Sequence, residues 1–206
     1  MVPKNQIEIL RLSQVGEAPP RYAYQPVGKR WAEGELTGKT NLFSQVGIGL
    51  RGAQFRLHRA AGITLFDAVR WRGSHYFLTG IQQKSPAEAV LSAALAEPVP
   101  CTAWRPAGKH PGAYGSPDAF LEAVGFPGIL VEKYQGYQRE TPYGEVQATY
   151  VLVAPKAVEL RLGDRVTTGE GRTGPEDQKG PAYGVRAVHA LDPYKNEYEL
   201  YRYEEV

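Results

Sequence analysis

The sequence predicts a mainly β protein with two small antiparallel β-barrel-like domains joined by a short helical segment. Short runs of alternating apolar and polar residues are the first sign, because a period of two is typical of half-buried strands. The second is a content of 23 glycines and 16 prolines, which favour turns over long helices. The third is an excess of tyrosine, 13 residues against 6 phenylalanines, since tyrosine buries its ring while its hydroxyl reaches water. We expect a β-domain at residues 1–84, a helical linker at 85–127 and a second β-domain at 128–206.

The first β-domain is predicted to contain several short strands and one bulge. Strand patterns occur at residues 6–12, 22–27 and 29–36. Apolar residues then alternate up to Leu50 and resume on the other parity with Phe55 and Leu57. A slip of one residue turns side chains to the opposite face of a sheet, so the switch at Arg51-Gly52 indicates a bulge.

A hairpin is expected to close this domain before the helical linker begins. Apolar runs flank a turn that contains Gly73, which is typical of a β-hairpin. Ser85-Pro86-Ala87-Glu88 then combines a helix N-cap, a proline at the first helical position and a capping-box glutamate. Helical spacing follows at Val90, Leu91, Ala94 and Leu95. The pattern predicts a helix that ends before Pro98, and a second, shorter helix over residues 116–124.

The second β-domain is predicted to contain a long hairpin and three further strands. The hairpin arms are expected at 129–138 and 145–154, and the strands at 158–166, 182–190 and 197–203. Residues 167–181 contain no aliphatic side chain, so we expect an exposed, mobile loop there. Its charged residues form a candidate docking or plug loop: Glu170, Arg172, Glu176, Asp177 and Lys179. The two halves share a similar order of strands, without an evident repeat of residues.

We predict no catalytic, cofactor-binding or metal-binding residues. Gly38-Lys39-Thr40 is similar to the end of a phosphate-binding loop, but position 33, where that pattern requires glycine, is glutamate. None of the four histidines occurs at metal-ligand spacing. Cys101 is the only cysteine, which excludes an intrachain disulfide and fits a reducing compartment. No signature of a nucleophile surrounds it.

Basic residues are concentrated in one short stretch. Five arginines lie within 22 residues, with only Asp67 opposed: Arg51, Arg56, Arg59, Arg70 and Arg72. Since strand residues alternate between faces, Arg56 is expected to point away from Phe55, and Arg70 and Arg72 away from Trp71, so one sheet face is expected to be rich in arginine. They form either an ordinary charged sheet face or a patch that contacts DNA phosphates or an acidic partner, and phosphate binding would depend strongly on salt.

Five segments of the first domain carry a resemblance to a known family: residues 31–33, 55–59, 63–65, 68–73 and 75–81. They give a strand that ends in arginine, an Ile-Thr step, a hairpin with a glycine turn, and an exit strand with the pattern Tyr-x-hydrophobic. This order resembles the small head–tail connector proteins, also called head-closure or stopper proteins, of long-tailed phages and prophages. Residues 150–156, 162–166 and 196–200 resemble sequences downstream of that module in some prophage proteins.

The resemblance implies a small β-barrel that forms a homo-oligomeric ring, about twelvefold, in the neck of the virion. The implied partners are a portal or adaptor protein, a tail terminator or tail tube protein, and double-stranded DNA bound without sequence specificity. No catalysis, cofactor or membrane is implied, and the protein would be made in the bacterial cytoplasm. The expected helical linker and second β-domain depart from the simplest members of the family.

Two other classes remain open. The first is an intracellular nucleic-acid-binding module of SH3-like or OB-like type, which salt-dependent binding of naked DNA would favour. The second is an enzyme with an unrecognised site, which a cluster of His58, Cys101 and a carboxylate would favour. The N-terminus lacks the apolar core of a signal peptide, and no apolar run approaches the roughly 20 residues of a membrane helix. We therefore expect a soluble chain.

Overall fold

The computed structural model describes residues 5–41, 49–58, 60, 62–107, 120–133, 149–169 and 181–203. Within these residues the chain is mainly β, and no helix occurs. All twelve strands of the described part belong to a single sheet. The prediction of a mainly β fold is confirmed, and the prediction of a helical segment between the two β regions is wrong.

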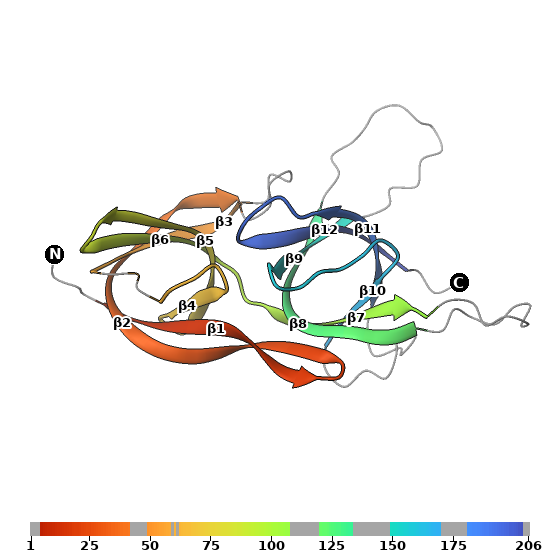
Figure 1. The fold of residues 1–206 in the computed structure, drawn as a ribbon. Helices are drawn as coiled ribbons and strands as arrows, with labels where there is room; N and C mark the ends of the chain where they lie inside the picture. Colours follow the sequence, from red (N-terminus) through yellow and green to blue (C-terminus); the bar gives the residue numbers. More distant parts are fainter. Residues whose placement is uncertain are drawn as a thin grey trace, which may run out of the picture.

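The first six strands form one half of the molecule. They are β1 (Asn5–Glu17), β2 (Pro20–Asn41), β3 (Gly49–Leu57), β4 (Asp67–Trp71), β5 (Ser74–Ser85) and β6 (Glu88–Leu95). Their pairings run in the order β2-β1-β4-β5-β6-β3, and β3 pairs again with β2. The pairings therefore form a closed circuit, the red to olive part of Figure 1.

The other six strands form the second half. They are β7 (Val99–Pro106), β8 (Phe120–Lys133), β9 (Thr149–Pro155), β10 (Arg165–Thr168), β11 (Ala182–His189) and β12 (Lys195–Arg202). Their pairings run in the order β8-β7-β10-β11-β12-β9, and β9 pairs again with β8. Each strand of the second half therefore corresponds to the strand numbered six lower in the first half. The two halves are repeats of one topology, shown side by side in Figure 1.

A pair of buried aspartates shows that the repeat extends to residues. Asp67 accepts hydrogen bonds from Arg11 Nε at 2.7 Å and from the backbone N–H of Thr64 at 2.7 Å. Asp164 accepts them from Arg105 Nε at 3.0 Å and from the backbone N–H of Arg161 at 2.9 Å. In both halves the arginine comes from the first strand and the aspartate begins or precedes the fourth. The sequence signal is Leu-x-Asp-x-Val, at residues 65–69 and 162–166.

The predicted first helix is strand β6, which forms a hairpin with β5. Ser85 pairs with Glu88 across the turn, so the expected N-cap and capping box flank a β-turn instead. Both faces of β6 are covered: Leu91 faces the interior of the first half, and Ala94 faces the second half. A strand buried on both faces carries a nearly continuous apolar run, which imitates helical spacing.

The predicted second helix is also wrong, where the structure describes it. Phe120 to Val124 belong to β8, while residues 116–119 lie outside the described part. Val124 and Phe126 are both buried, which is the period of two of a strand. The expected arms at 129–138 and 145–154 correspond to the pairing of β8 with β9, and their turn lies outside the described residues.

Two features of the first half follow the predictions closely. The hairpin of β4 and β5 turns through Arg72 and Gly73, whose φ angles of 53° and 83° are both positive, as in a type I′ turn. A bulge is also present opposite Gly52, but the extra residue is Gly38 on the neighbouring strand β2, and β3 itself continues through Gly52 without a shift. A Cβ atom at Gly52 would lie 2.2 Å from Thr40 Oγ1, so only glycine fits opposite this bulge.

Boundaries in the second half differ from the prediction. The expected strand at 158–166 is a turn through Gly163, followed by the short strand β10. The expected loop at 167–181 begins later, because Thr167 is fully buried in β10 and its Oγ1 accepts a hydrogen bond from Trp104 Nε1 at 2.9 Å. Residues 170–180 lie outside the described part. The closing strands at 182–190 and 197–203 are confirmed as β11 and β12.

The two halves are joined by a shared apolar cluster. It consists of Phe77, Ala94 and Ala96 from the first half and Ile129, Val151 and Val153 from the second. Beside it, Tyr194 Oη accepts a hydrogen bond from the backbone N–H of Ile81 at 3.0 Å. A single parallel bridge, Arg21 with Gly125, connects β2 to β8. Each half has its own core as well, so the contact between them is an interface between two folded units.

Candidate functional site

The structure divides the predicted arginine cluster into separate groups. Arg56 lies 3.3 Å from Glu88 and 3.6 Å from Glu33, and Arg70 lies 2.9 Å from Glu8. These two arginines are on β3 and β4, which are not adjacent in the sheet.

The remaining arginines have different surroundings. Arg72 stacks on the ring of Trp71, with its guanidinium carbon 4.4 Å from the ring centre. Arg51 and Arg72 both act on Tyr76, where their charges oppose the rise in pKa that burial causes. Arg51 pairs in register with Lys39, while Arg59 lies outside the described residues. The cluster is therefore partly neutralised by glutamates, as on an ordinary charged sheet face.

A cleft of about 700 Å³ lies where the two halves meet, and this was not predicted. Its walls come from β2, from the β4–β5 hairpin, from the linker between β6 and β7, and from β7 and β8. Aromatic and proline side chains make up much of the lining: Tyr22, Tyr24, Phe126, Pro98, Pro100 and Pro127. Such a volume is within the range of ligand-binding clefts. We call this feature the waist cleft.

Two strand edges border the waist cleft. Residues 22–24 of β2 pair with β1 on one edge, and residues 126–128 of β8 pair with β7 on one edge. Among the described residues neither segment has a strand partner on its other edge, because β2 and β8 share only the bridge at Arg21 and Gly125. Successive residues of a strand direct their N–H and C=O groups to alternate edges, so part of this backbone faces the cleft.

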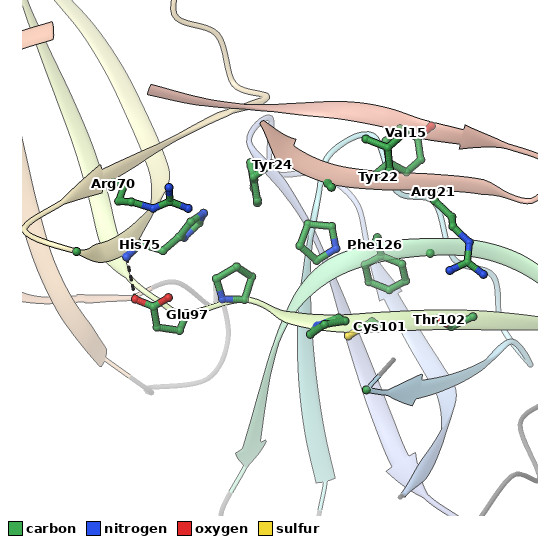
Figure 2. A pocket seen from close by; sticks show the side chains of 17 residues that line it. Val15, Arg21, Tyr22, Tyr24, Arg70, His75, Glu97, Cys101, Thr102 and Phe126 are labelled. Carbon is green, nitrogen blue, oxygen red and sulfur yellow. Dashed lines mark hydrogen bonds between the residues drawn. The ribbon is translucent and has the colours of Figure 1, made fainter. Parts of the chain in front are cut away.

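His75 forms the polar end of the waist cleft. Its Nδ1 is 2.9 Å from the carbonyl oxygen of Ala96, so Nδ1 carries the proton and donates. Its backbone N–H donates to Glu97 Oε1 at 2.8 Å, and its carbonyl accepts from the N–H of Ala96 at 3.1 Å. Figure 2 shows Glu97 bonded to His75, with Arg70 and Tyr24 close by. Three hydrogen bonds thus fasten the linker between the halves to β5.

The second nitrogen of His75 has no hydrogen-bond partner in the part of the chain that the structure describes. The residue is 5% exposed, and Nε2 is buried without a hydrogen bond from any described group. Burial lowers the pKa of this imidazole and Arg70 adds to the effect, against the opposing influence of Ala96 and Glu97. The ring is therefore neutral at pH 7, and Nε2 is an acceptor. Residue spacing in the sequence gives no signal for this role of His75.

The other groups that could support chemistry are not arranged for it. His58 does not line the waist cleft, whereas Cys101 does. Burial raises the pKa of the Cys101 thiol to about 12, so it stays protonated at neutral pH. Figure 2 shows Cys101 beside Phe126 and Thr102, at the other end of the cleft from His75.

Metal ligands and membrane segments are not found in the described part. None of its His, Cys, Asp and Glu residues form a group of three or more that could hold a metal ion. No helix long and apolar enough to cross a membrane occurs there either. No family model matches the chain, and no curated protein or solved structure matches it.

Proposed function

We propose that the chain is a structural protein of the neck of a tailed phage or prophage. In this proposal its two barrel-like domains form part of a ring that joins the portal to the tail and helps to retain or pass DNA. The observation that carries the proposal is the place of residues 55–81. They end β3, supply all of β4 and begin β5, within a closed circuit of six strands. A small β-barrel is the architecture that the resemblance implies for that segment.

The ion pairs of the arginine face support the same proposal. DNA that must pass through a channel is held too tightly when many phosphates are neutralised by free cations. Arg56 and Arg70 each have a glutamate partner within 3.6 Å, so they present little uncompensated charge. The same pairs count against the alternative of a dedicated nucleic-acid-binding module, which needs a free basic patch.

Assembly can be tested on the purified protein. We expect a ring in native mass spectrometry and in negative-stain images. Since each chain supplies two equivalent units, a ring of twelve units needs six chains, whereas twelvefold symmetry of chains gives 24 units. A chain that stays monomeric at all concentrations, also with portal and tail proteins present, would contradict the proposal.

Location is the decisive test. Particles assembled without this chain are expected to fill with DNA and then to lack tails and leak their DNA. A gold-labelled antibody against the protein should mark the junction of head and tail. Normal tailed particles in its absence, or labelling elsewhere, would refute the neck assignment. Binding of naked DNA that weakens steeply with salt would favour the nucleic-acid-binding module instead.

A further inference from the structure

The waist cleft combines an open backbone edge with a wall suited to an extended chain. Residues 22–24 of β2 and 126–128 of β8 diverge after their single bridge, and each has one edge without a strand partner in the described part. An extended peptide that enters such a gap gains main-chain hydrogen bonds from an edge and side-chain contacts from its walls. Tyr22, Tyr24 and Phe126 supply aromatic surface for those contacts.

The charges around the waist cleft select the kind of peptide. Arg21 is paired with Glu122 at 2.6 Å, and Arg70 with Glu8 at 2.9 Å, so both cations are compensated. Glu97 has no ion pair with any described cation and receives only the backbone N–H of His75. With both lining arginines neutralised by glutamates, Glu97 is the lining charge that stays uncompensated among the described residues.

The polar end of the cleft accepts hydrogen bonds. Nε2 of the neutral His75 is buried and has no hydrogen-bond partner among the described residues, so only a donor that reaches this ring can satisfy its lone pair. A carboxylate beside an unsatisfied acceptor favours a group that is cationic and rich in N–H donors.

We propose that the waist cleft binds an extended peptide of a partner protein that pairs with the open edge of β2 and places a basic side chain at Glu97 and His75. This inference does not depend on the neck assignment. Because the interaction uses the backbone, it requires a strand-like ligand. Because of Glu97, it requires a lysine or arginine near the centre of that strand.

The test uses the full chain labelled with ¹⁵N and four probes. The first is an acetylated and amidated five-residue peptide of valine, threonine, arginine, threonine and valine. The second has glutamate in place of arginine, and the third has methyl groups on the backbone nitrogens of both threonines. The fourth is butylguanidinium. We expect the first probe to shift the amide resonances of Ala23, Tyr24, Phe126 and Gly128. The affinity of each of the other three probes should be lower by about tenfold or by a larger factor.

Two variants test whether the negative charge of Glu97 selects the basic peptide. In Glu97→Gln the amide oxygen still accepts the His75 N–H, so the linker stays fastened while the charge is lost. We expect this variant to bind the arginine peptide about tenfold more weakly and to lose its preference over the glutamate peptide. Glu159→Gln, an exposed glutamate outside the waist cleft, is the matched control and should bind like the unaltered protein.

Several results would overturn the proposal. Equal binding of the N-methylated peptide or of butylguanidinium would show that no strand pairing occurs. Unchanged binding in Glu97→Gln, or shifts confined to β3 and β4, would place the peptide elsewhere. If the same cleft amides shift with protein concentration alone, and the peptide does not reverse that shift, a second copy of the chain is the occupant.

Discussion

The two buried aspartates provide a quantitative test of the repeat. Asp67→Asn and Asp164→Asn each keep the shape of the side chain and remove its charge. Asp164 accepts hydrogen bonds from Arg105 Nε and Nη2, at 3.0 and 2.8 Å, and from the N–H of Arg161. Asparagine has one acceptor oxygen, so its NH₂ group must face at least one of these donors. The same reasoning holds for Asp67 and Arg11 in the first half.

The expected loss of stability follows from the geometry. A hydrogen bond to a charged group contributes about 1.5–3 kcal/mol. Breaking a fully buried ion pair costs about 3–5 kcal/mol. The aspartates are buried, but the arginine side chains are 34% and 40% exposed, so water can solvate them when the carboxylate is lost. We therefore expect each substitution to lower the free energy of unfolding by about 2–3 kcal/mol, and by similar amounts in the two halves.

Urea unfolding followed by tryptophan fluorescence measures both effects, because Trp71 lies in the first half and Trp104 in the second. Glu33→Gln, which removes one partner of the exposed Arg56, is the control and should change the free energy by less than about 0.5 kcal/mol. A loss below about 0.5 kcal/mol at either aspartate would refute the structural role of the pair. A large loss at one aspartate and none at the other would refute their equivalence.

Four further outcomes are expected. Thr167→Val leaves the indole N–H of Trp104 without its acceptor. It should lower the free energy of unfolding by about 1–3 kcal/mol and with it the melting temperature, whereas Thr167→Ser should change neither. The free energy of unfolding should fall as the pH drops below 6.5, the usual pKa of histidine. The cause is that His75 binds a proton in the unfolded chain more readily than in the folded one, where its pKa is lowered, and His75→Gln should make the free energy depend less on pH. Cys101 should resist iodoacetamide at pH 8 in the native protein and react in urea. Amides of residues 167–181 beyond β10 should gain protection from hydrogen exchange only on assembly.

Each of these expectations has a clear contrary result. Equal melting temperatures for the two Thr167 variants would show that the hydroxyl is dispensable. A stability that stays constant between pH 7 and pH 5 would show that His75 titrates alike in the folded and unfolded chain. Rapid alkylation of native Cys101 would show that its thiol is accessible. Strong protection of the loop in the isolated chain would refute a docking role.

The sequence predicts strands well where turn residues bound the apolar run, as in β4 and β5, and poorly in β6, where residues typical of a helix N-terminus precede it. The hairpin around Gly73 was predicted because apolar alternation and a turn glycine agree. β6 was taken for a helix because Leu91 and Ala94 are buried on opposite faces, one in the first core and one at the junction. The second covering layer belongs to a part of the chain more than 30 residues away, which local patterns do not report.

The repeat and the waist cleft escaped prediction for a different reason. The pattern Leu-x-Asp-x-Val is too short to be noticed without the structure, because the arginine partners are more than 50 residues away from the aspartates. His75 acquires its unsatisfied nitrogen only from the packing of Ala96 and Tyr24 around it. Both features depend on contacts between distant segments, whereas local spacing determines turns and alternation.

The repeat also explains why an open edge exists at the waist. β2 and β8 hold equivalent places, and in each the first part pairs with the preceding strand and the second part with the following one. Among the described residues, the change of partner leaves one edge of the first part without a strand partner in both halves. The two uncovered edges meet at Arg21 and Gly125 and then diverge. Exposed edges favour pairing with another strand. An added strand therefore gains most main-chain hydrogen bonds along the edges that have no strand partner at the junction.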